Sequence, residues 1–276
     1  MAYLQPDNEL LLVLQSVTEI LSTLNLSQCA LIVKEIHDKF QKTIPNSVNS
    51  TSTLSKFHNL QTTSESEFGN TAHRSDIIKQ LQDAIRLTVS NNQTEMRHIL
   101  NESNVIEIGT MRINALRILR SYEQVIRRGS KTSEERMIGF SFYYMGLVDG
   151  VYRNSLRMCY IWEQLSHLDQ VDTSRIWQTD VGNIQQYFVT NSLHLGYFEG
   201  WNRNVRNAVG HSTFHFDNIK NKMIYEDIHA NSIVELSESE LMELIENLSN
   251  VFEILLVQNQ IFRVNDICDT FIQRYP

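Results

Sequence analysis

Residues 132–166 read TSEERMIGFSFYYMGLVDGVYRNSLRMCYIWEQLS, and this stretch decides the fold. At its start Thr132 precedes Glu135 by three positions, which is the spacing of a capping box at a helix N-terminus. Apolar side chains then recur at helical intervals: Met137, Phe140, Tyr144, Leu147, Val148, Val151 and Leu156. The stretch therefore predicts one long helix with one side in a core.

The sequence on both sides of this stretch also favours helices. Residues 105–128 have a helical pattern that ends at Gly129, and residues 183–209 have another. A second capping box, Ser237-x-x-Glu240, begins an amphipathic pattern that runs to Phe262. Since the 276 residues include only 10 glycines and 3 prolines, turns are few. We expect an all-α protein built as a helical bundle.

One segment departs from the helical pattern. Residues 213–217 and 222–226 favour β-structure on either side of a polar turn, which is the pattern of a hairpin. The predicted bundle therefore carries a small β-hairpin after residue 211.

The first 130 residues form a separate predicted region. Residues 7–24 and 28–42 have amphipathic helical patterns. Residues 43–74, rich in Ser, Thr and Asn, have too little apolar content to pack well and predict a polar loop. We place the domain boundary at Gly129–Lys131, which gives an N-terminal helical region of residues 1–130 and a second domain of residues 131–276.

Within the first region, helical pattern resumes at Ser75, a residue type that favours the N-cap position. Thr94 is a second N-cap candidate, for a further short helix. We therefore expect two consecutive helices between the polar loop and residue 105.

Composition limits the function. The net charge of −8 argues against a protein that coats nucleic acid by charge alone, although a local basic site remains compatible with it. The cysteines, Cys29, Cys159 and Cys268, are too few and too far apart for a disulfide framework or a zinc site. There is no secretory signal and no run of about 20 apolar residues. We expect a cytoplasmic protein without membrane spans, metal or cofactor.

Residues 206–211, RNAVGH, are the candidate chemical centre. Histidine is the side-chain type that exchanges protons near neutral pH, so His211 can take a proton from a 2′-hydroxyl or give one to a leaving 5′-oxygen. Arg206 offers a fork of donors to a phosphate as negative charge builds. Asn207 can donate to phosphate or hold the histidine tautomer. Such a site would cleave RNA without a metal.

The spacing of these residues sets a geometric condition. On a continuous helix, positions five apart point about 140° away from each other. Gly210 can adopt left-handed backbone angles and end the helix, which would bring His211 back beside Arg206. We expect the helix to end at 209–211 and both side chains to line one cleft.

Two charged residues precede this motif. Glu199 lies two helical turns before Arg206, on the same face of the predicted helix, and would orient Arg206 or His211. Glu199 is also four positions before Arg203, so a surface ion pair between these two residues is the competing interpretation, and the favoured one. Asp149, on the long helix, could also approach the site.

The motif resembles the R-N-x-x-x-H form found in the HEPN superfamily (higher eukaryotes and prokaryotes nucleotide-binding domain). The resemblance covers about residues 131–262, with helices before the motif and a hairpin and helix after it. Gly210 departs from the commonest form, which has alanine there. The resemblance implies a helical bundle, a homodimer with a composite cleft, and metal-independent RNA cleavage that leaves a 2′,3′-cyclic phosphate.

The resemblance also implies a biological class. Many members are toxins or antiviral defence effectors, some with an antitoxin or regulatory partner, while others have lost activity and act as binding modules. Three hypotheses follow: an endoribonuclease, a non-catalytic module that binds RNA or a nucleotide, and a helical protein-interaction module.

Two further clusters have open interpretations. Arg117, Arg120, Arg127 and Arg128 form the clearest basic patch, which would guide RNA or would simply be a solvated helix face. His211 and His215 would form a metal pair only on a helix, and the β-pattern after Gly210 argues against that.

Overall fold

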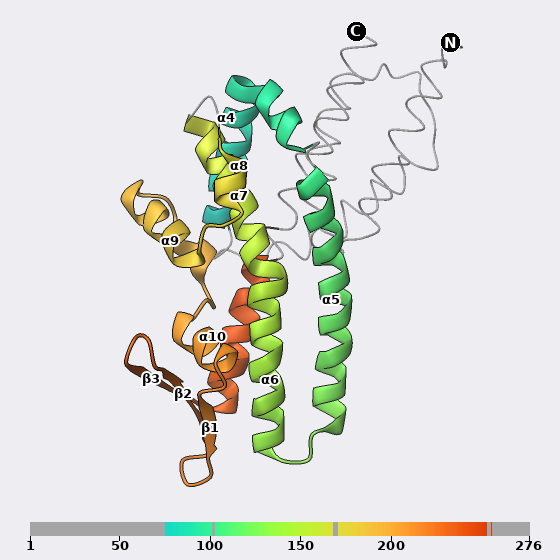
Figure 1. Cartoon of the computed structure of the whole chain (residues 1–276), viewed down its shortest axis with the longest axis vertical. Coiled ribbons are helices and arrows are strands. Elements are labelled where there is room, and N and C mark those ends of the chain that lie inside the picture. The colour runs from blue at the N-terminus through green and yellow to red at the C-terminus, as the bar shows by residue number, and fades with distance from the viewer. Residues whose placement is uncertain (1–74, 101–102, 168–170, 253–254, 256–276) are drawn as a thin grey trace, which may run out of the picture. The chain divides into compact units, whose positions relative to one another are not determined.

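The computed structural model describes residues 75–100, 103–167, 171–252 and 255 (Figure 1). The predicted helices at 7–24 and 28–42 and the polar loop at 43–74 lie outside these residues. The chain divides into two compact units, of which the first includes α4 (Ser75–Leu100) and the second spans Asn101–Leu255. None of the described helices is long and apolar enough to cross a membrane.

Helix α4 begins at Ser75, as predicted, and consists of two helical segments that meet at a kink. Its backbone leaves helical geometry at Asn92 (φ −135°, ψ 37°), two residues before the expected second cap at Thr94. The two predicted consecutive helices are therefore present, and the break between them lies close to the predicted cap.

The predicted long helix is confirmed, with one irregularity (Figure 1). It consists of α6 (Ser133–Leu147), the π-helical turn η2 (Val148–Tyr152) and α7 (Arg153–His167). The capping box is present, since Thr132 Oγ1 accepts from Glu135 N at 3.1 Å and Glu135 Oε2 accepts from Thr132 N at 3.4 Å. The π-turn, which no local signal predicted, holds one more residue per turn than an α-helix.

Helix α5 (Ser103–Gly129) confirms the helix expected at 105–128 and packs against α6 (Figure 1). The connection between the two is short, at residues 130–132. Leu119 and Ile126 are buried on α5, and Met137, Phe140 and Tyr144 are buried on α6. The apolar positions named from the sequence thus form part of the core.

The prediction of one helix over residues 183–209 is wrong. The chain forms α8 (Thr173–Ile176), α9 (Val181–Thr190), the 3-10 turn η3 (Leu195–Phe198) and α10 (Arg203–Gly210). Two left-handed residues interrupt the helix, namely Ser192 (φ 55°) and Gly200 (φ 75°). A helix cannot pass through such angles. The apolar spacing continues across both turns, so periodicity alone does not reveal them.

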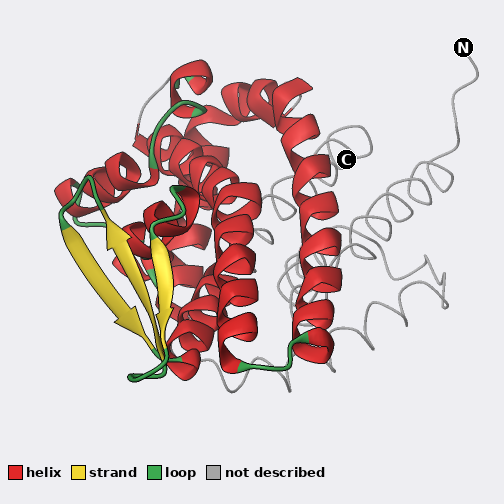
Figure 2. Ribbon diagram, turned by 60° about the horizontal axis from the view of Figure 1, so that its bottom comes forward, coloured by secondary structure: helices red, strands yellow, loops and turns green. Residues whose placement is uncertain are grey.

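The predicted hairpin is confirmed and has a third strand (Figure 2). Strands β1 (Phe214–Asp217), β2 (Lys222–Asp227) and β3 (Ser232–Leu236) form an antiparallel sheet in that order. Phe214 pairs with Tyr225, and Asp217 pairs with Lys222. The second capping box follows, where Glu240 N donates to Ser237 Oγ at 3.3 Å, and residues 238–252 are helical. The described chain is mostly helical, with this small sheet.

Candidate active site

Helix α10 is positioned by a buried tyrosine on α6. The Tyr144 hydroxyl donates to the Gly200 carbonyl at 2.9 Å and accepts from Asn202 N at 2.7 Å. Burial raises the pKa of this hydroxyl far above its usual value, so it stays a donor at any physiological pH. Asn202 then caps α10, because its Oδ1 accepts from Asn204 N at 3.0 Å and Val205 N at 3.2 Å.

The buried face of α10 leaves its polar face available. Val205, Ala208 and Val209 are buried, and the helix packs against β2 and α6. Arg206 and Asn207 are therefore half-buried at the edge of this contact. The packing of this short helix fixes the backbone positions of Arg206 and Asn207.

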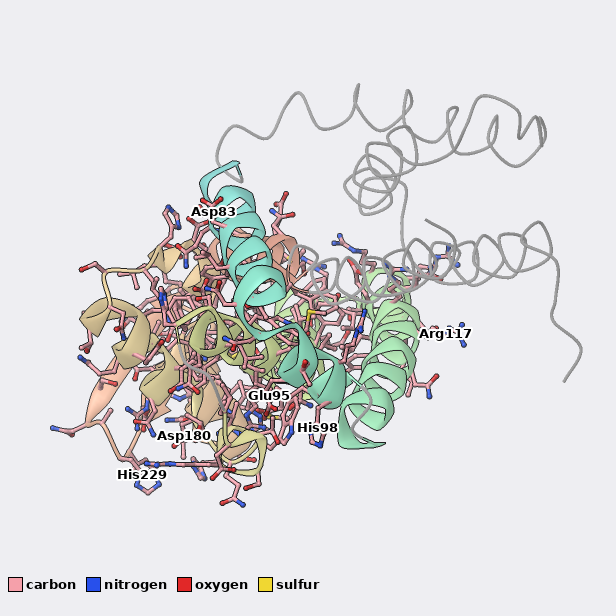
Figure 3. The ribbon with its side chains drawn as sticks, turned by 90° about the horizontal axis from the view of Figure 1, so that it is seen from above. Asp83, Glu95, His98, Arg117, Asp180 and His229 are labelled. Carbon is pink, nitrogen blue, oxygen red and sulfur yellow. The ribbon has the colours of Figure 1, made fainter. Side chains whose placement is uncertain are left out.

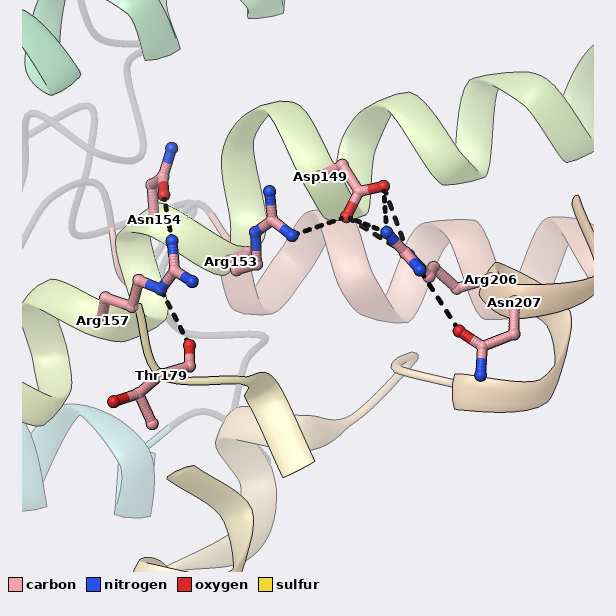
Figure 4. Close-up of polar contacts among 7 residues, drawn as sticks. All are labelled: Asp149, Arg153, Asn154, Arg157, Thr179, Arg206 and Asn207. Carbon is pink, nitrogen blue, oxygen red and sulfur yellow. Dashed lines mark hydrogen bonds and ion pairs between the residues drawn. The ribbon is translucent and has the colours of Figure 1, made fainter. Parts of the chain in front are cut away.

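Arg206 is held by a carboxylate from the π-turn (Figure 4). Its Nη2 lies 2.9 Å from Asp149 Oδ2 and its Nε lies 3.3 Å from Asp149 Oδ1, which is a side-on bidentate pair. The two side chains are 33% and 29% exposed, so solvent reaches the pair. The sequence placed Asp149 on the long helix but did not predict its contact. The structure makes it the partner of Arg206.

Asn207 connects Arg206 to the sheet. Its Oδ1 accepts from Arg206 Nη1 at 3.3 Å, and its Nδ2 donates to Asp227 Oδ2 at 2.8 Å. Asp227 is 2% exposed, and its Oδ1 accepts from the backbone N–H groups of His229 at 3.1 Å and Ala230 at 3.2 Å. Asn207 therefore bridges the motif arginine and a buried carboxylate.

The end of α10 confirms the predicted position but not the predicted cause. His211 is the C-cap residue, and Ser212, with φ 58°, is the left-handed residue. Ser212 N donates to Val209 O at 3.2 Å and Thr213 N donates to Ala208 O at 2.8 Å, which is a Schellman motif. The expectation of a left-handed Gly210 is wrong, because Gly200 is the one glycine in the described part of the chain with positive φ.

Gly210 has room for a side chain. A Cβ at this position would lie 3.9 Å from Met145 Sδ and 4.0 Å from Arg206 Nη1, which is ordinary van der Waals contact. The glycine therefore has no steric or conformational role that alanine could not fill.

His211 is exposed, and its closest ring neighbour is a second histidine. The centroids of the His211 and His229 rings are 5.2 Å apart, with an interplanar angle of 71°. No hydrogen bond joins Arg206 directly to His211 within the described residues. The backbone N–H of His211 donates to Asn207 O at 2.9 Å, which is the hydrogen bond of the last turn of α10.

The structure does not place Glu199 and Arg203 as predicted. Glu199 is exposed and caps η3, and Gly200 turns the chain before α10 begins, so Glu199 does not share a helical face with Arg206. Nor does an ion pair link Glu199 to Arg203 in the part of the chain that the structure describes. Arg203 is exposed at the start of α10, and its charge helps to lower the pKa of Asp227.

The predicted basic patch lies on α5 and is exposed at all four of its arginines: Arg117, Arg120, Arg127 and Arg128. Figure 3 shows the Arg117 side chain pointing away from its helix. Arg127 is already engaged, with its Nε 2.8 Å from Glu123 Oε1 and its guanidinium over the Phe140 ring at 5.5 Å. No described contact joins these residues to Arg206.

A second group of cations lies nearer the motif and was missed. Arg153 Nη1 is 3.4 Å from Asp149 Oδ1, and Arg157 Nε donates to Thr179 O at 3.0 Å (Figure 4). Burial first, and the charge of Arg153 second, lower the pKa of Arg157. The sequence contains a signal for this group, because positions four apart on a helix are neighbours. Asp149, Arg153 and Arg157 have this spacing.

Metal ligands do not gather at this site. No group of three or more His, Cys, Asp or Glu side chains is arranged to hold a metal ion among the described residues. His215 lies on β1, with Nδ1 3.8 Å from Glu226 Oε1, and belongs to the hairpin.

Comparison with known proteins returns no match, whether to a protein-family model, to a curated protein or to a solved structure.

Replacing Asp227 with asparagine should weaken the dependence of the free energy of unfolding on pH at acidic pH. The hydrogen bond from Asn207 is the main cause that holds the pKa of Asp227 below its ordinary value of 3.8. Because the folded pKa is depressed, the stabilisation is present above about pH 4 and is lost as the pH falls through the folded value. Urea unfolding followed by circular dichroism should show a wild-type advantage at pH 7 that shrinks below pH 4.

Asp180→Asn is the matched control for this prediction, because the Asp180 side chain makes no capping hydrogen bond. An Asp227→Asn difference from wild type that does not shrink below pH 4, or that shrinks no more than the Asp180→Asn difference does, would contradict the prediction.

Proposed function

We propose that this protein is a metal-independent endoribonuclease of HEPN type. The observation that carries the proposal is that α10 presents an anchored, half-exposed Arg206, whose guanidinium donates to Asn207, and ends in an exposed His211. A phosphate-binding cation and an acid/base group at one helix end are the minimum set for cleavage through a 2′-hydroxyl.

Arg206 keeps donors for a phosphate. A guanidinium has five N–H donors, of which one on Nε and one on Nη2 face Asp149, and one on Nη1 faces Asn207. One N–H on Nη1 and one on Nη2 remain. These two N–H groups can donate to a non-bridging phosphate oxygen while Asp149 fixes the plane of the guanidinium.

The charge balance beside Arg206 favours an anion. Asp149 carries one negative charge, whereas Arg206 and Arg153 both contact it. The group therefore keeps a net positive charge, and Arg157 adds a further cation in the next helical turn. We propose that RNA phosphates follow this group, with Arg117, Arg120, Arg127 and Arg128 as an additional contact surface.

The reaction needs no metal ion. His211 would exchange a proton with the RNA as the 2′-oxygen attacks phosphorus and the P–O5′ bond breaks. Arg206 would offset the negative charge that builds on the phosphate oxygens. The products would be a 2′,3′-cyclic phosphate and a 5′-hydroxyl.

Incubation of the purified protein with mixed RNA in EDTA tests the proposal. Wild type should cleave and leave 2′,3′-cyclic phosphate ends, while Arg206→Ala and His211→Ala should not. His215→Ala is the matched control, because His215 is an exposed histidine whose described ionic contact is with Glu226 on the neighbouring strand. Equal behaviour of wild type and the two site variants would remove the proposal.

The setting of this activity is part of the same proposal. We expect a homodimer in the cytoplasm, with the motifs of two copies at one composite cleft, and a toxin or antiviral role with an antitoxin or another regulatory partner. Light scattering gives the oligomeric state. Growth arrest on expression in a bacterial host, absent for His211→Ala, tests the toxin role.

A binding module without cleavage is the second candidate. On α5 the apolar residues Ile118 and Val125 are 68% and 64% exposed beside the four arginines. A mixed apolar and basic face is typical of a surface that contacts a partner. RNA or protein binding that is lost in Arg117→Glu but unaffected by His211→Ala, with no cleavage by wild type, would favour this candidate.

A further inference from the structure

The candidate site contains a second exposed histidine that the motif does not include. His229 lies in the turn between β2 and β3, and its ring centroid is 5.2 Å from that of His211. Both side chains are exposed, and Figure 3 shows His229 at the surface of the protein. Two imidazoles from different elements therefore meet at one solvent-accessible place.

The turn that carries His229 is fixed by the motif itself. Asp227 Oδ1 accepts from the backbone N–H groups of His229 and Ala230, while Asp227 Oδ2 accepts from Asn207 Nδ2. Asp227 also pairs with Ser232 across the strands, and Asn231 (φ 47°) completes the turn. The backbone position of His229 is thus tied to Asn207 by two consecutive hydrogen-bonded contacts.

We propose that His229 is the second acid/base group of the RNA cleavage, acting opposite His211; this inference depends on the proposed function. In-line attack puts the entering 2′-oxygen and the leaving 5′-oxygen on opposite sides of phosphorus. One imidazole cannot take a proton on one side and give one on the other in a single step. A neighbouring pair, one neutral and one protonated, can.

The proposed step is balanced. The neutral histidine takes the proton of the 2′-hydroxyl as the 2′-oxygen bonds to phosphorus. The P–O5′ bond breaks with its electron pair on the 5′-oxygen, which receives the proton of the protonated histidine. Exchange with water restores both rings. The nearest charged groups with a described contact to this turn are Asp227, which accepts from the backbone N–H of His229, and Arg203 on α10, whose charge helps to lower the pKa of Asp227.

The test compares single-turnover cleavage by wild type, His211→Ala, His229→Ala and the control His215→Ala across pH. Two substrates are used, a normal RNA and an RNA with sulfur in place of the bridging 5′-oxygen, whose leaving thiolate needs no acid. His229→Ala keeps the turn, because Asp227 binds the backbone of residue 229 and not its ring. His229→Gln and circular dichroism check the fold.

We expect His229→Ala to lose about a hundredfold in rate on normal RNA, and to lose one limb of a bell-shaped pH profile. The sulfur substrate should restore one of the two variants and not the other, which identifies the acid. His229→Ala at the wild-type rate, with His211→Ala inactive, overturns this inference alone, as does failure of the sulfur substrate to restore either variant. A wild type that leaves RNA intact overturns the proposed function and this inference with it.

Discussion

Replacing Gly200 with alanine should destabilise the fold by about 2–6 kcal/mol. Gly200 has φ 75°, a conformation that costs an L-residue about 1–3 kcal/mol. A Cβ there would come within 2.6 Å of Leu244 O and 2.8 Å of Asn247 C, and would also overlap Leu248 N. These are backbone atoms of the helix at 238–252, which cannot move aside as a side chain could, and overpacking adds about 1–3 kcal/mol.

The measurement is urea unfolding followed by circular dichroism, with Gly182→Ala as the control. A Cβ at Gly182 meets nothing within 4 Å, and the residue lies in α9. Since alanine favours a helix over glycine, this variant should gain up to about 1 kcal/mol. Similar unfolding midpoints for the two variants would show that the Gly200 turn is not tightly packed.

Arg206→Lys should lower the RNA cleavage rate by about 10²–10³-fold. A lysine keeps the positive charge but has no planar fork, so it cannot hold Asp149 side-on and present two further donors to a phosphate. The loss should appear in kcat more than in KM, because the phosphate contact strengthens as charge develops in the transition state.

Arg136→Lys is an unusually close control for this variant. Arg136 also forms a side-on pair, with Nε 2.8 Å from Glu238 Oε1 and Nη2 3.0 Å from Glu238 Oε2. Its exposure, 32% for the arginine and 33% for the glutamate, nearly equals that of the Arg206–Asp149 pair. Both lysine variants should lose a similar and small stability, because each pair is reached by solvent. Only Arg206→Lys should lose cleavage, and equal activity of the two would contradict a catalytic role for Arg206.

Local signals predicted the elements with distinct ends. The capping boxes at Thr132 and Ser237 identified two helix starts, and alternation identified the first hairpin, because each depends on residues within a few positions of one another. The helix at 183–209 failed for the opposite reason. Apolar spacing continued through the segment, whereas the turn at Gly200 depends on Tyr144, which is 56 positions away.

The motif could be found from the sequence, but its surroundings could not. Arg206, Asn207 and His211 are neighbours in the chain, so their spacing is visible. Asp149 is 57 positions from Arg206 and Asp227 is 20 positions from Asn207, and each contact exists only in the folded chain. His229 is located through Asp227 and was therefore missed with it.

The π-turn at Val148–Tyr152 gives a criterion for recognising related sequences. A π-turn contains one residue more than an α-turn, and it lies between the buried residues Tyr144 and Leu156 while Asp149 reaches Arg206. A chain one residue shorter between the equivalents of Tyr144 and Asp149 could keep Tyr144 and Leu156 buried on a regular helix, but its carboxylate would face another direction, because one residue turns a helix by about 100°. An alignment gap just before this aspartate therefore marks the loss of the carboxylate that orients the arginine, even where the R-N-x-x-x-H letters are unchanged.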